Sequence, residues 1–211
     1  MMSRPMAWVA GVAVIATCIG GCSQSGDSDS ATSSSTAMPV NSTTQGSPVR
    51  PTLTDTSLQP PTQQNKYTTE GRPEVVVDPC TWFGDEAIAK AGLDPSTRRR
   101  GSDLVAEYTF LTCDFDGKYR DLSIDSGNVT WEEDLQKNGA ISEPLTVNGR
   151  DAMWVLDPDL QGTCDIHLRT KVGFVILSAV RTHEGIQAGL QRCDGVLEMA
   201  EAIEPEIGEE N

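Results

Sequence analysis

The stretch YTFLTCDFDGKYRDLSID, residues 108–125, decides the fold of this chain. Its first half is rich in strand-forming residues, and Asp116-Gly117 near its centre is a strong turn signal. In its second half, Leu122 and Ile124 alternate with acidic and hydroxyl residues. This alternation predicts an antiparallel hairpin that buries one face and leaves the other in water.

Four further strands are predicted after this hairpin. Residues 145–147 and 152–156 form a second hairpin, because Asn148-Gly149 between them is a highly favourable two-residue turn sequence. Residues 163–169 and 172–180 are two more strand candidates, because both are rich in β-branched and apolar residues. The strands therefore follow one another in an antiparallel meander.

Three helices are expected around these strands. Asp78-Pro79-Cys80 supplies an N-cap and a first turn for a helix that continues through an Ala-rich run to Gly92. Thr130-Trp131-Glu132-Glu133 is a capping box that opens a short helix ending at Gly139. Apolar residues three or four apart over residues 186–203 predict an amphipathic helix that closes the domain. The expected fold class is α+β, an antiparallel sheet of about five or six strands with N-terminal and C-terminal helices packed on it.

Residues 1–21 are expected to be a secretory signal peptide with a lipobox. Arg4 gives a positive start, residues 7–19 are almost wholly apolar, and Gly20-Gly21 place small residues before Cys22. Cys22 would then be the lipidated first residue of the mature protein, held on the extracytoplasmic face of the cell membrane by its acyl chains. The alternatives are an ordinary signal peptide and an uncleaved anchor.

A long polar segment follows the proposed lipidation site. Residues 23–70 are dominated by Ser, Thr, Gln, Pro, Asp and Gly, and their apolar residues are scattered singly. Such a segment buries too little apolar surface to offset its ordering entropy, so a disordered tether is expected. The predicted organisation is therefore lipidated Cys and tether over 22–71, one α+β domain over 72–207, and an acidic tail over 208–211.

The charge of the chain excludes several classes of partner. Lys and Arg total 16 against 31 Asp and Glu, so the formal net charge is −15. Nucleic acids and anionic bilayers repel such a protein, and contact with the membrane is expected through the lipid anchor. No second stretch of about 20 apolar residues follows the N-terminal one, which argues against a polytopic membrane protein.

The expected mature chain contains four cysteines besides Cys22, and all four lie in the predicted domain: Cys80, Cys113, Cys164 and Cys193. An even number in an exported domain predicts two disulfides, for which three pairings exist. We favour Cys80–Cys113 and Cys164–Cys193, because each joins a helix to a nearby strand and the two loops do not interlace. A zinc site is the alternative, which the lack of any C-x-x-C pair disfavours.

These features resemble the actinobacterial lipoproteins of the domain of unknown function 3558 (DUF3558) family. The likeness rests on the lipobox, the Ser/Thr/Pro-rich tether, Asp78-Pro79-Cys80 opening an Ala-rich helix, and the later strand and helix cysteines. It covers roughly residues 75–207. Members often open the C-terminal helix with a second Asp-Pro-Cys, where this chain has Gln191-Arg192-Cys193. The resemblance implies an envelope lipoprotein of undefined activity and carries over no catalytic residues.

The sequence contains no Gly-rich phosphate loop and no G-x-S-x-G, S-x-x-K or H-E-x-x-H motif. His167 and His183 are interpreted as ordinary surface or sheet histidines, although either is able in principle to join a Ser and an Asp in a triad. Asp114-Phe115-Asp116-Gly117 and Asp157-Pro158-Asp159 offer oxygens to Ca²⁺, but they have too few ligands for a calcium loop and are interpreted as turns. No cofactor and no metal are expected.

Two clusters of large side chains admit a structural and a functional interpretation. Arg98-Arg99-Arg100 is interpreted as a solvated loop, with contact to lipid headgroups, cell-wall phosphate or an acidic partner as the alternative. Trp82, Phe83, Trp131 and Trp154 are assigned to core packing rather than to a ligand site. An exposed position for Trp131, at the first turn of its helix, stays open.

The expected function is that of a surface-tethered binding or adaptor module in the cell envelope, with an unknown envelope protein or an apolar ligand as its partner. The alternatives are an envelope hydrolase with a nonstandard site and a carrier of a lipid or another apolar molecule. An open apolar groove, a closed apolar cavity, and a cleft that joins a histidine to an acid and a nucleophile would distinguish the three.

Overall fold

The computed structural model describes residues 53–211. The expected signal peptide, Cys22 and most of the expected tether therefore lie outside the described residues. Within the described part, no helix is both long enough and apolar enough to cross a membrane.

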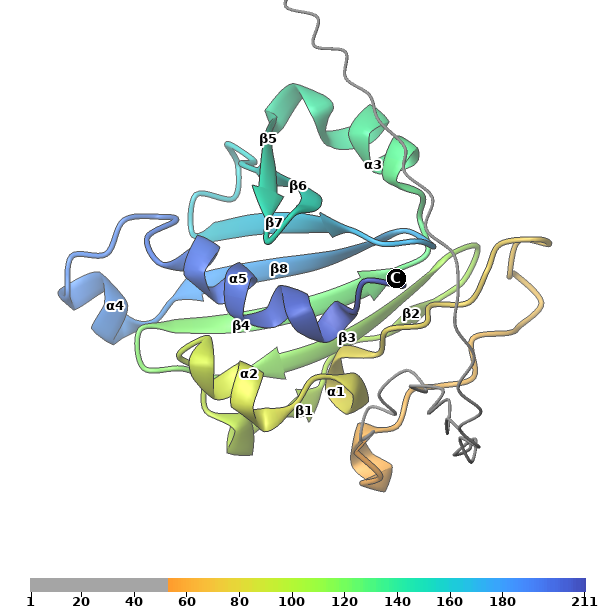
Figure 1. Ribbon diagram of the computed structural model, residues 1–211, viewed down its shortest axis with the longest axis horizontal. Coiled ribbons are helices and arrows are strands. Elements are labelled where there is room, and N and C mark those ends of the chain that lie inside the picture. The colour runs from red at the N-terminus through yellow and green to blue at the C-terminus, as the bar shows by residue number, and fades with distance from the viewer. Residues whose placement is uncertain (1–52) are drawn as a thin grey trace, which may run out of the picture. The chain divides into compact units, whose positions relative to one another are not determined.

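One antiparallel sheet organises the described part of the chain (Figure 1). Its eight strands are β1 (Arg99–Arg100), β2 (Leu104–Val105), β3 (Thr109–Phe115), β4 (Arg120–Gly127), β5 (Ser142–Val147), β6 (Arg150–Val155), β7 (Thr163–Arg169) and β8 (Phe174–Arg181). They lie in the order β1-β3-β4-β8-β7-β6-β5, and β2 pairs with β3. The expectation of five or six strands was too low, because β1 and β2 have two residues each and are too short to show alternation.

Both predicted hairpins are present. Strands β3 and β4 pair in the register Phe115↔Leu122, which places Phe115, Leu122 and Ile124 on one face and Thr112 and Asp125, together with the apolar Phe110, on the other. Strands β5 and β6 meet at Asn148-Gly149, where φ is +50° at Asn148 and +95° at Gly149. Two successive positive φ values are the geometry that an Asn-Gly hairpin turn requires.

The helices are α1 (Pro79–Trp82), α2 (Asp85–Lys90), α3 (Trp131–Asn138), α4 (His183–Gln187) and α5 (Val196–Ile207), with 3₁₀ turns η1 (Thr56–Leu58), η2 (Pro95–Thr97) and η3 (Gly139–Ile141). Helix α3 begins with the predicted capping box, in which Thr130 accepts from the Glu133 N–H and Glu133 accepts from the Thr130 N–H. Local capping chemistry therefore positions this helix.

The single helix expected from Asp78 is in fact two helices. The backbone is extended at Phe83, whose buried side chain fills the core, and Gly84 starts α2. The predicted end is correct: Gly92 has a φ of +80°, and the Leu93 N–H donates to the Ile88 carbonyl at 3.2 Å. This pattern is the one that a C-terminal glycine commonly supports.

The closing helix is also shorter than the expected 186–203. Gly189 and Gly195 have φ values of +80° and +77°, so they separate α4 from α5. The buried Arg120 guanidinium donates to three carbonyls of the connection, those of Gln191, Arg192 and Asp194. The i, i+3/i+4 spacing of apolar residues was therefore not sufficient evidence for helix across this segment.

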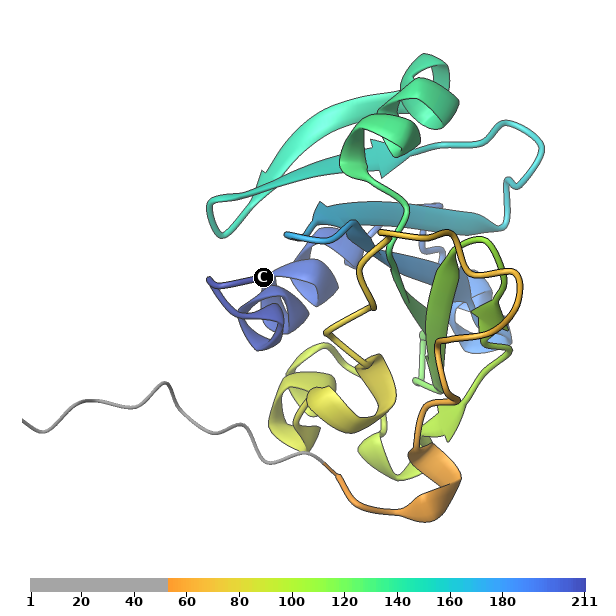
Figure 2. The ribbon, with the colours of Figure 1, turned by 90° about the vertical axis from the view of Figure 1, so that its right-hand side faces the viewer.

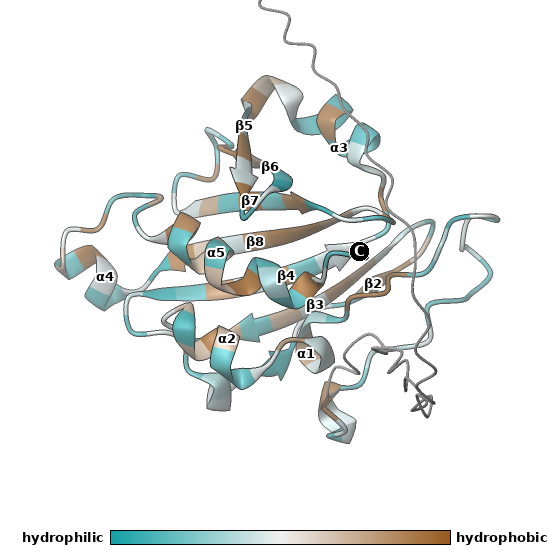
Figure 3. Ribbon diagram, viewed as in Figure 1, coloured by the Kyte–Doolittle hydropathy of each residue, from teal (hydrophilic) through white to brown (hydrophobic). Residues whose placement is uncertain are grey.

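Helices α1, α2 and α5 lie on one side of the sheet (Figures 1 and 2). The main core lies between these helices and the sheet. It includes Phe115, Ile124, Leu177, Ile88 and Ile203, all at most 1 % exposed. Figure 3 shows hydrophobic residues along the strands over which these helices lie. This side of the sheet is therefore closed by packing.

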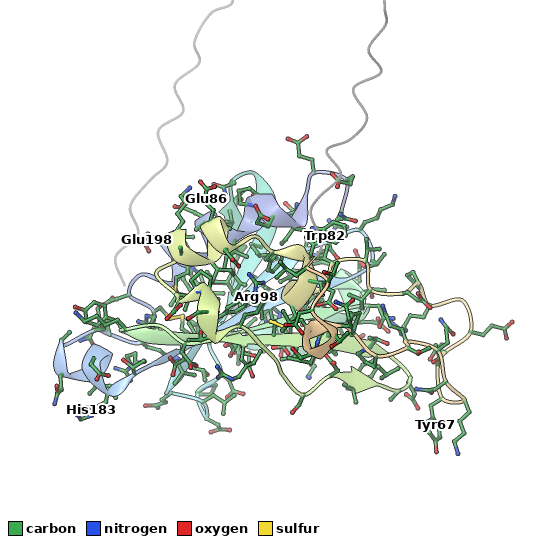
Figure 4. All side chains as sticks on the ribbon, turned by 90° about the horizontal axis from the view of Figure 1, so that it is seen from below. Tyr67, Trp82, Glu86, Arg98, His183 and Glu198 are labelled. Carbon is green, nitrogen blue, oxygen red and sulfur yellow. A yellow bond between two sulfur atoms is a disulfide. The ribbon has the colours of Figure 1, made fainter. Side chains whose placement is uncertain are left out.

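The opposite side of the sheet carries α3 and a smaller apolar cluster of Trp131, Met153, Val155 and Phe174. Trp131 is buried there, so the exposed position left open for it is wrong. Figure 4 shows α1, α2 and α5 on one side of the sheet and the side chains of this second face on the other. We call this side the α3 face.

Two disulfides connect helices or loops to the sheet. Cys80–Cys113 links α1 to β3, and Cys164–Cys193 links β7 to the connection before α5. These are the two pairs favoured from the sequence. Without its disulfide, each of these two pairs of segments would be held together only by non-covalent packing.

Two polar segments pack on the domain where a tether and a free tail were expected. The side chain of Gln63 bonds both the N–H and the carbonyl of Val75, at 2.8 and 3.0 Å, and Asn65 donates to the Val105 carbonyl. At the other end, Arg150 donates to the carbonyls of Gly208 and Asn211. Composition misses these segments because side-chain-to-backbone hydrogen bonds hold them, together with a few contacts such as the packing of Leu58 on the main core.

Candidate functional site

A cavity of about 300 Å³ opens on the α3 face, where α3 meets strands β3, β7 and β8. We call it the α3 cavity. Its apolar wall consists of Tyr108, Phe110, Val129, Phe174 and Ile176. Its polar wall consists of Glu133, Asp134, Lys137, Asn138 and His167. A concave site with aromatic walls and a few convergent polar groups is the usual form of a small-ligand site.

Three aromatic rings form the apolar wall. The rings of Tyr108 and Phe110 are 5.9 Å apart at 86°, and those of Phe110 and Phe174 are 5.8 Å apart at 62°. Phe110 lies across Gly127 of β4, where a Cβ atom would come within 2.3 Å of the ring. The glycine therefore makes room for the ring that lines the cavity.

A buried histidine and a buried aspartate form the inner part of the polar wall. His167 of β7 is 5 % exposed and Asp134 of α3 is 2 % exposed, and the His167 Nδ1 lies 2.6 Å from the Asp134 Oδ2. Asn138 donates to the other Asp134 oxygen at 2.7 Å, and the His167 ring stacks on Phe174. Within the described part of the chain, the His167 Nε2 has no hydrogen-bond partner.

The rim of the cavity is tied to Arg72, at the start of the predicted domain. Both terminal nitrogens of Arg72 bond the Glu133 carboxylate at 3.1 Å, and one of them also donates to the Asn128 carbonyl. Arg72 and the Thr130 backbone lower the pKa of Glu133 to about 2. Glu133 is therefore ionised and already matched by a guanidinium charge.

A further carboxylate lies beside the cavity on the same face. Asp125 of β4 stands opposite Ile176 of β8, which stands opposite His167 of β7, so the three form one row across the sheet. Burial raises the pKa of Asp125, against a lowering hydrogen bond from the Thr112 hydroxyl at 2.6 Å, and neighbouring carboxylates raise it further. Its charge is consequently unfavourable in the folded state.

Replacement of Asp125 by asparagine is expected to stabilise the domain at pH 7. The amide keeps an acceptor for Thr112 and removes the charge that burial opposes. Because the folded-state pKa lies above the unfolded one, this charge opposes folding only above about pH 4, so the gain should vanish in stronger acid. Urea unfolding at pH 7 and pH 3 measures the difference.

The control is Asp159→Asn, which removes one negative charge from an exposed position in the connection between β6 and β7 and is not among the groups that shift the pKa of Asp125. A general relief of negative charge would stabilise both variants equally. An Asp125→Asn gain that is absent at pH 7, or unchanged at pH 3, would contradict the assignment.

The two histidines have different surroundings. His167 is a buried sheet residue, and no Ser, Thr or Cys side chain lines its cavity, so the described residues form no triad there. His183 lies exposed at the first position of α4, away from the α3 cavity, and contacts Gln187 at 2.9 Å (Figure 4). The sequence did not identify Asp134 as a partner, although the capping box places it in the first turn of α3.

The basic cluster is not the solvated loop that was expected. Arg99 and Arg100 form β1, and all three arginines bond carboxylates: Arg98 with Asp85, Arg99 with Asp116, and Arg100 with Asp78 and Asp103. Each guanidinium lies 3.2 Å or less from a carboxylate oxygen. The short strand and its acidic neighbours therefore hold the three arginines against the domain instead of leaving them in a solvated loop. The cluster is a structural element of the fold.

The other sequence candidates also have structural roles. Asp116 pairs with Arg99, and Asp157 accepts from the Asp159 N–H within its own turn. Among the described residues, no group of three or more His, Cys, Asp or Glu side chains is arranged to hold a metal ion. Trp82 donates its indole N–H to the Glu206 carbonyl, and Trp154 packs against the main core.

Comparison with known families adds one finding. The family described as "Protein of unknown function (DUF3558)" matches residues 17–206 of this chain. The chain belongs to this family. No curated protein and no solved structure matches it. The DUF3558 match covers both the α3 cavity and the segment that contains Cys22, so both features belong to the part of the chain that the family model describes.

Proposed function

We propose that this DUF3558 protein is a lipoprotein of the actinobacterial cell envelope, anchored through Cys22, and that its domain binds a small ligand in the α3 cavity. The family match supports the first part, because it begins at residue 17, ahead of Gly20-Gly21-Cys22. The two disulfides support an oxidising location outside the cytoplasm.

The observation that carries the binding role is His167, a buried side chain whose Nε2 has no partner among the described residues and which lines an aromatic cavity. The Nε2 atom is not among the fully enclosed atoms without a partner, so it is open to the cavity and a ligand there would supply its partner. Cavities of about 300 Å³ lie at the lower limit of small-ligand sites.

The same geometry makes the two alternative functions less favoured. A hydrolase of the triad type needs a hydroxyl or thiol beside the histidine, and none of the described residues that line the α3 cavity is a Ser, Thr or Cys. A carrier needs an enclosed apolar space, whereas this cavity has exposed side chains, Tyr108, Glu133 and Lys137, at its rim. Reversible binding of a small ligand fits best.

The anchor is tested by metabolic labelling with a palmitate analogue. The wild-type chain should incorporate the label and fractionate with the membrane, and Cys22→Ala should lose the label. Cys18→Ala is the matched control, because Cys18 lies within the apolar segment and should be removed with the signal peptide. Equal labelling of Cys22→Ala and wild type would refute the anchor.

The cavity is tested with phenethyl alcohol as a neutral probe and with the full chain labelled at the histidine Cε1 atoms. The chain has two histidines, so His167 reports on the cavity and His183 serves as an internal reference. The probe should shift the His167 signal alone. Val129→Trp should block this shift by filling the cavity, and Val180→Trp, at an exposed site on β8, should not. Equal shifts of both histidines would contradict the site.

A further inference from the structure

The charge around the α3 cavity is not balanced. Asp134 is 2 % exposed, and its partners in the described part of the chain are the His167 ring and the Asn138 amide. Neither partner carries a permanent charge. Asp125 accepts from the neutral Thr112 hydroxyl and has no ion-pair partner among the described residues. By contrast, Glu133 is paired with Arg72.

A buried carboxylate that no Lys or Arg side chain in the described part of the chain neutralises favours the entry of a positive charge, because desolvation of the carboxylate is costly. Asp125 adds to the negative electrostatic potential at the cavity, because it lies on the strand next to β8 and opposite Ile176 of the cavity wall. Burial disfavours the charged form of Asp125. A cation nearby would offset this cost by its attraction to the carboxylate. The domain as a whole is strongly acidic, which attracts cations from solution.

Two hydrogen-bonding groups of the cavity offer acceptors that a protonated amine is able to satisfy. When the His167 Nδ1–H donates to Asp134, the neutral ring presents Nε2 as an acceptor. The Asn138 amide uses a nitrogen for Asp134 and has its oxygen as a further acceptor. A ligand that satisfies these groups must bring N–H or O–H donors.

The aromatic wall is suited to hold such a group. A cation is attracted to ring faces within about 6 Å, and the rings of Tyr108 and Phe110 lie at 86° to each other on this wall. One face of Phe174 is occupied by the stacked His167 ring. Lys137 is the opposing charge at the rim, but it is exposed, so water screens it.

We propose that the ligand of the α3 cavity carries a protonated amine on a small aromatic or apolar body. Its N–H groups meet the His167 Nε2 and the Asp134 carboxylate, and its charge lies against the rings of Tyr108 and Phe110. This inference rests on the binding role proposed above and names the chemical class of the ligand.

The test compares three probes of similar size that differ in charge: phenethylammonium, neutral phenethyl alcohol and anionic phenylacetate. Each is titrated into the full chain at constant ionic strength, and the His167 Cε1 signal is followed with His183 as the reference. We expect the ammonium to bind about tenfold more tightly than the alcohol, and phenylacetate to bind more weakly than either.

Two variants separate the aromatic contribution from general effects. Tyr108→Leu removes a rim ring that is 39 % exposed, so the core is not disturbed, and it should reduce the preference for ammonium over alcohol severalfold. Tyr119→Leu is the matched control, because Tyr119 is 45 % exposed and does not line the cavity. It should leave the preference unchanged.

The outcomes distinguish the two proposals. Equal binding of ammonium and alcohol, or tighter binding of phenylacetate, would overturn the amine while leaving the cavity a ligand site. No His167 shift with any of the three probes would overturn the binding role and the amine together. Loss of the ammonium preference in Tyr119→Leu as well as Tyr108→Leu would overturn the assigned ring contact.

Discussion

Replacement of both Cys80 and Cys113 by alanine is expected to lower the free energy of unfolding by about 4 kcal/mol. The two cysteines are 33 residues apart, and a cross-link of this span removes that much loop-closure entropy from the unfolded chain. Both are fully buried, so loss of their sulfur atoms also leaves space in the main core. Urea unfolding followed by tryptophan fluorescence measures the change.

The second disulfide provides the comparison. Cys164 and Cys193 are 29 residues apart, so the entropic loss should be nearly the same. Cys193 is only partly buried, so the packing loss should be smaller. Cys22→Ala is the control for loss of a cysteine outside the domain and should not change the unfolding midpoint. An unchanged midpoint in the Cys80/Cys113 double variant would contradict the predicted contribution.

Replacement of Asp78 by alanine is expected to cost about 3–5 kcal/mol of stability. Asp78 accepts from the Cys80 N–H and caps α1, and its two oxygens lie 2.6 and 2.8 Å from one nitrogen of Arg100. Both side chains of the pair are nearly buried, at 9 % and 13 % exposure. Removal of the carboxylate takes away both the cap and the shorter of the two ion pairs, and leaves the nearly buried guanidinium with only Asp103, at 3.2 Å.

The chain contains a matched control at Asp94. Asp94-Pro95 has the same cap-and-proline arrangement as Asp78-Pro79, with the Ser96 N–H bonded to Asp94. Asp94 is exposed, however, and pairs with none of the described arginines. Asp94→Ala should lose only a cap, about 1 kcal/mol. Similar losses at Asp78 and Asp94, measured by urea unfolding, would show that the buried ion pair contributes little.

Much of the fold was predictable because its signals are local. The Asn148-Gly149 turn, the Thr130 capping box and the end of the first helix region at Gly92 each depend on residues within a few positions of one another. The errors came where a local pattern was incomplete. Two-residue strands show no alternation. Residues 190–195 have the spacing of a helix, but the Arg120 guanidinium of β4 bonds their carbonyl groups and holds them as a connection.

The candidate site was much less predictable. His167 and Asp134 are 33 positions apart and meet because α3 packs beside β7. Phe110 reaches the cavity wall because the β3–β4 register places Gly127 opposite it. Nothing in the neighbourhood of these residues along the chain signals the cavity, and the acidic row through Asp125 exists only after the strands are paired.

The sequence alone thus determined the α+β class, the turns and caps, and an even set of domain cysteines, because these follow from side-chain alternation and from short-range backbone chemistry. Tertiary structure decided which side of the sheet stays open to solvent, and it placed a buried histidine and its aspartate beside three rings. The reason is that a binding cavity depends on strand register and helix docking, which join residues far apart in the chain.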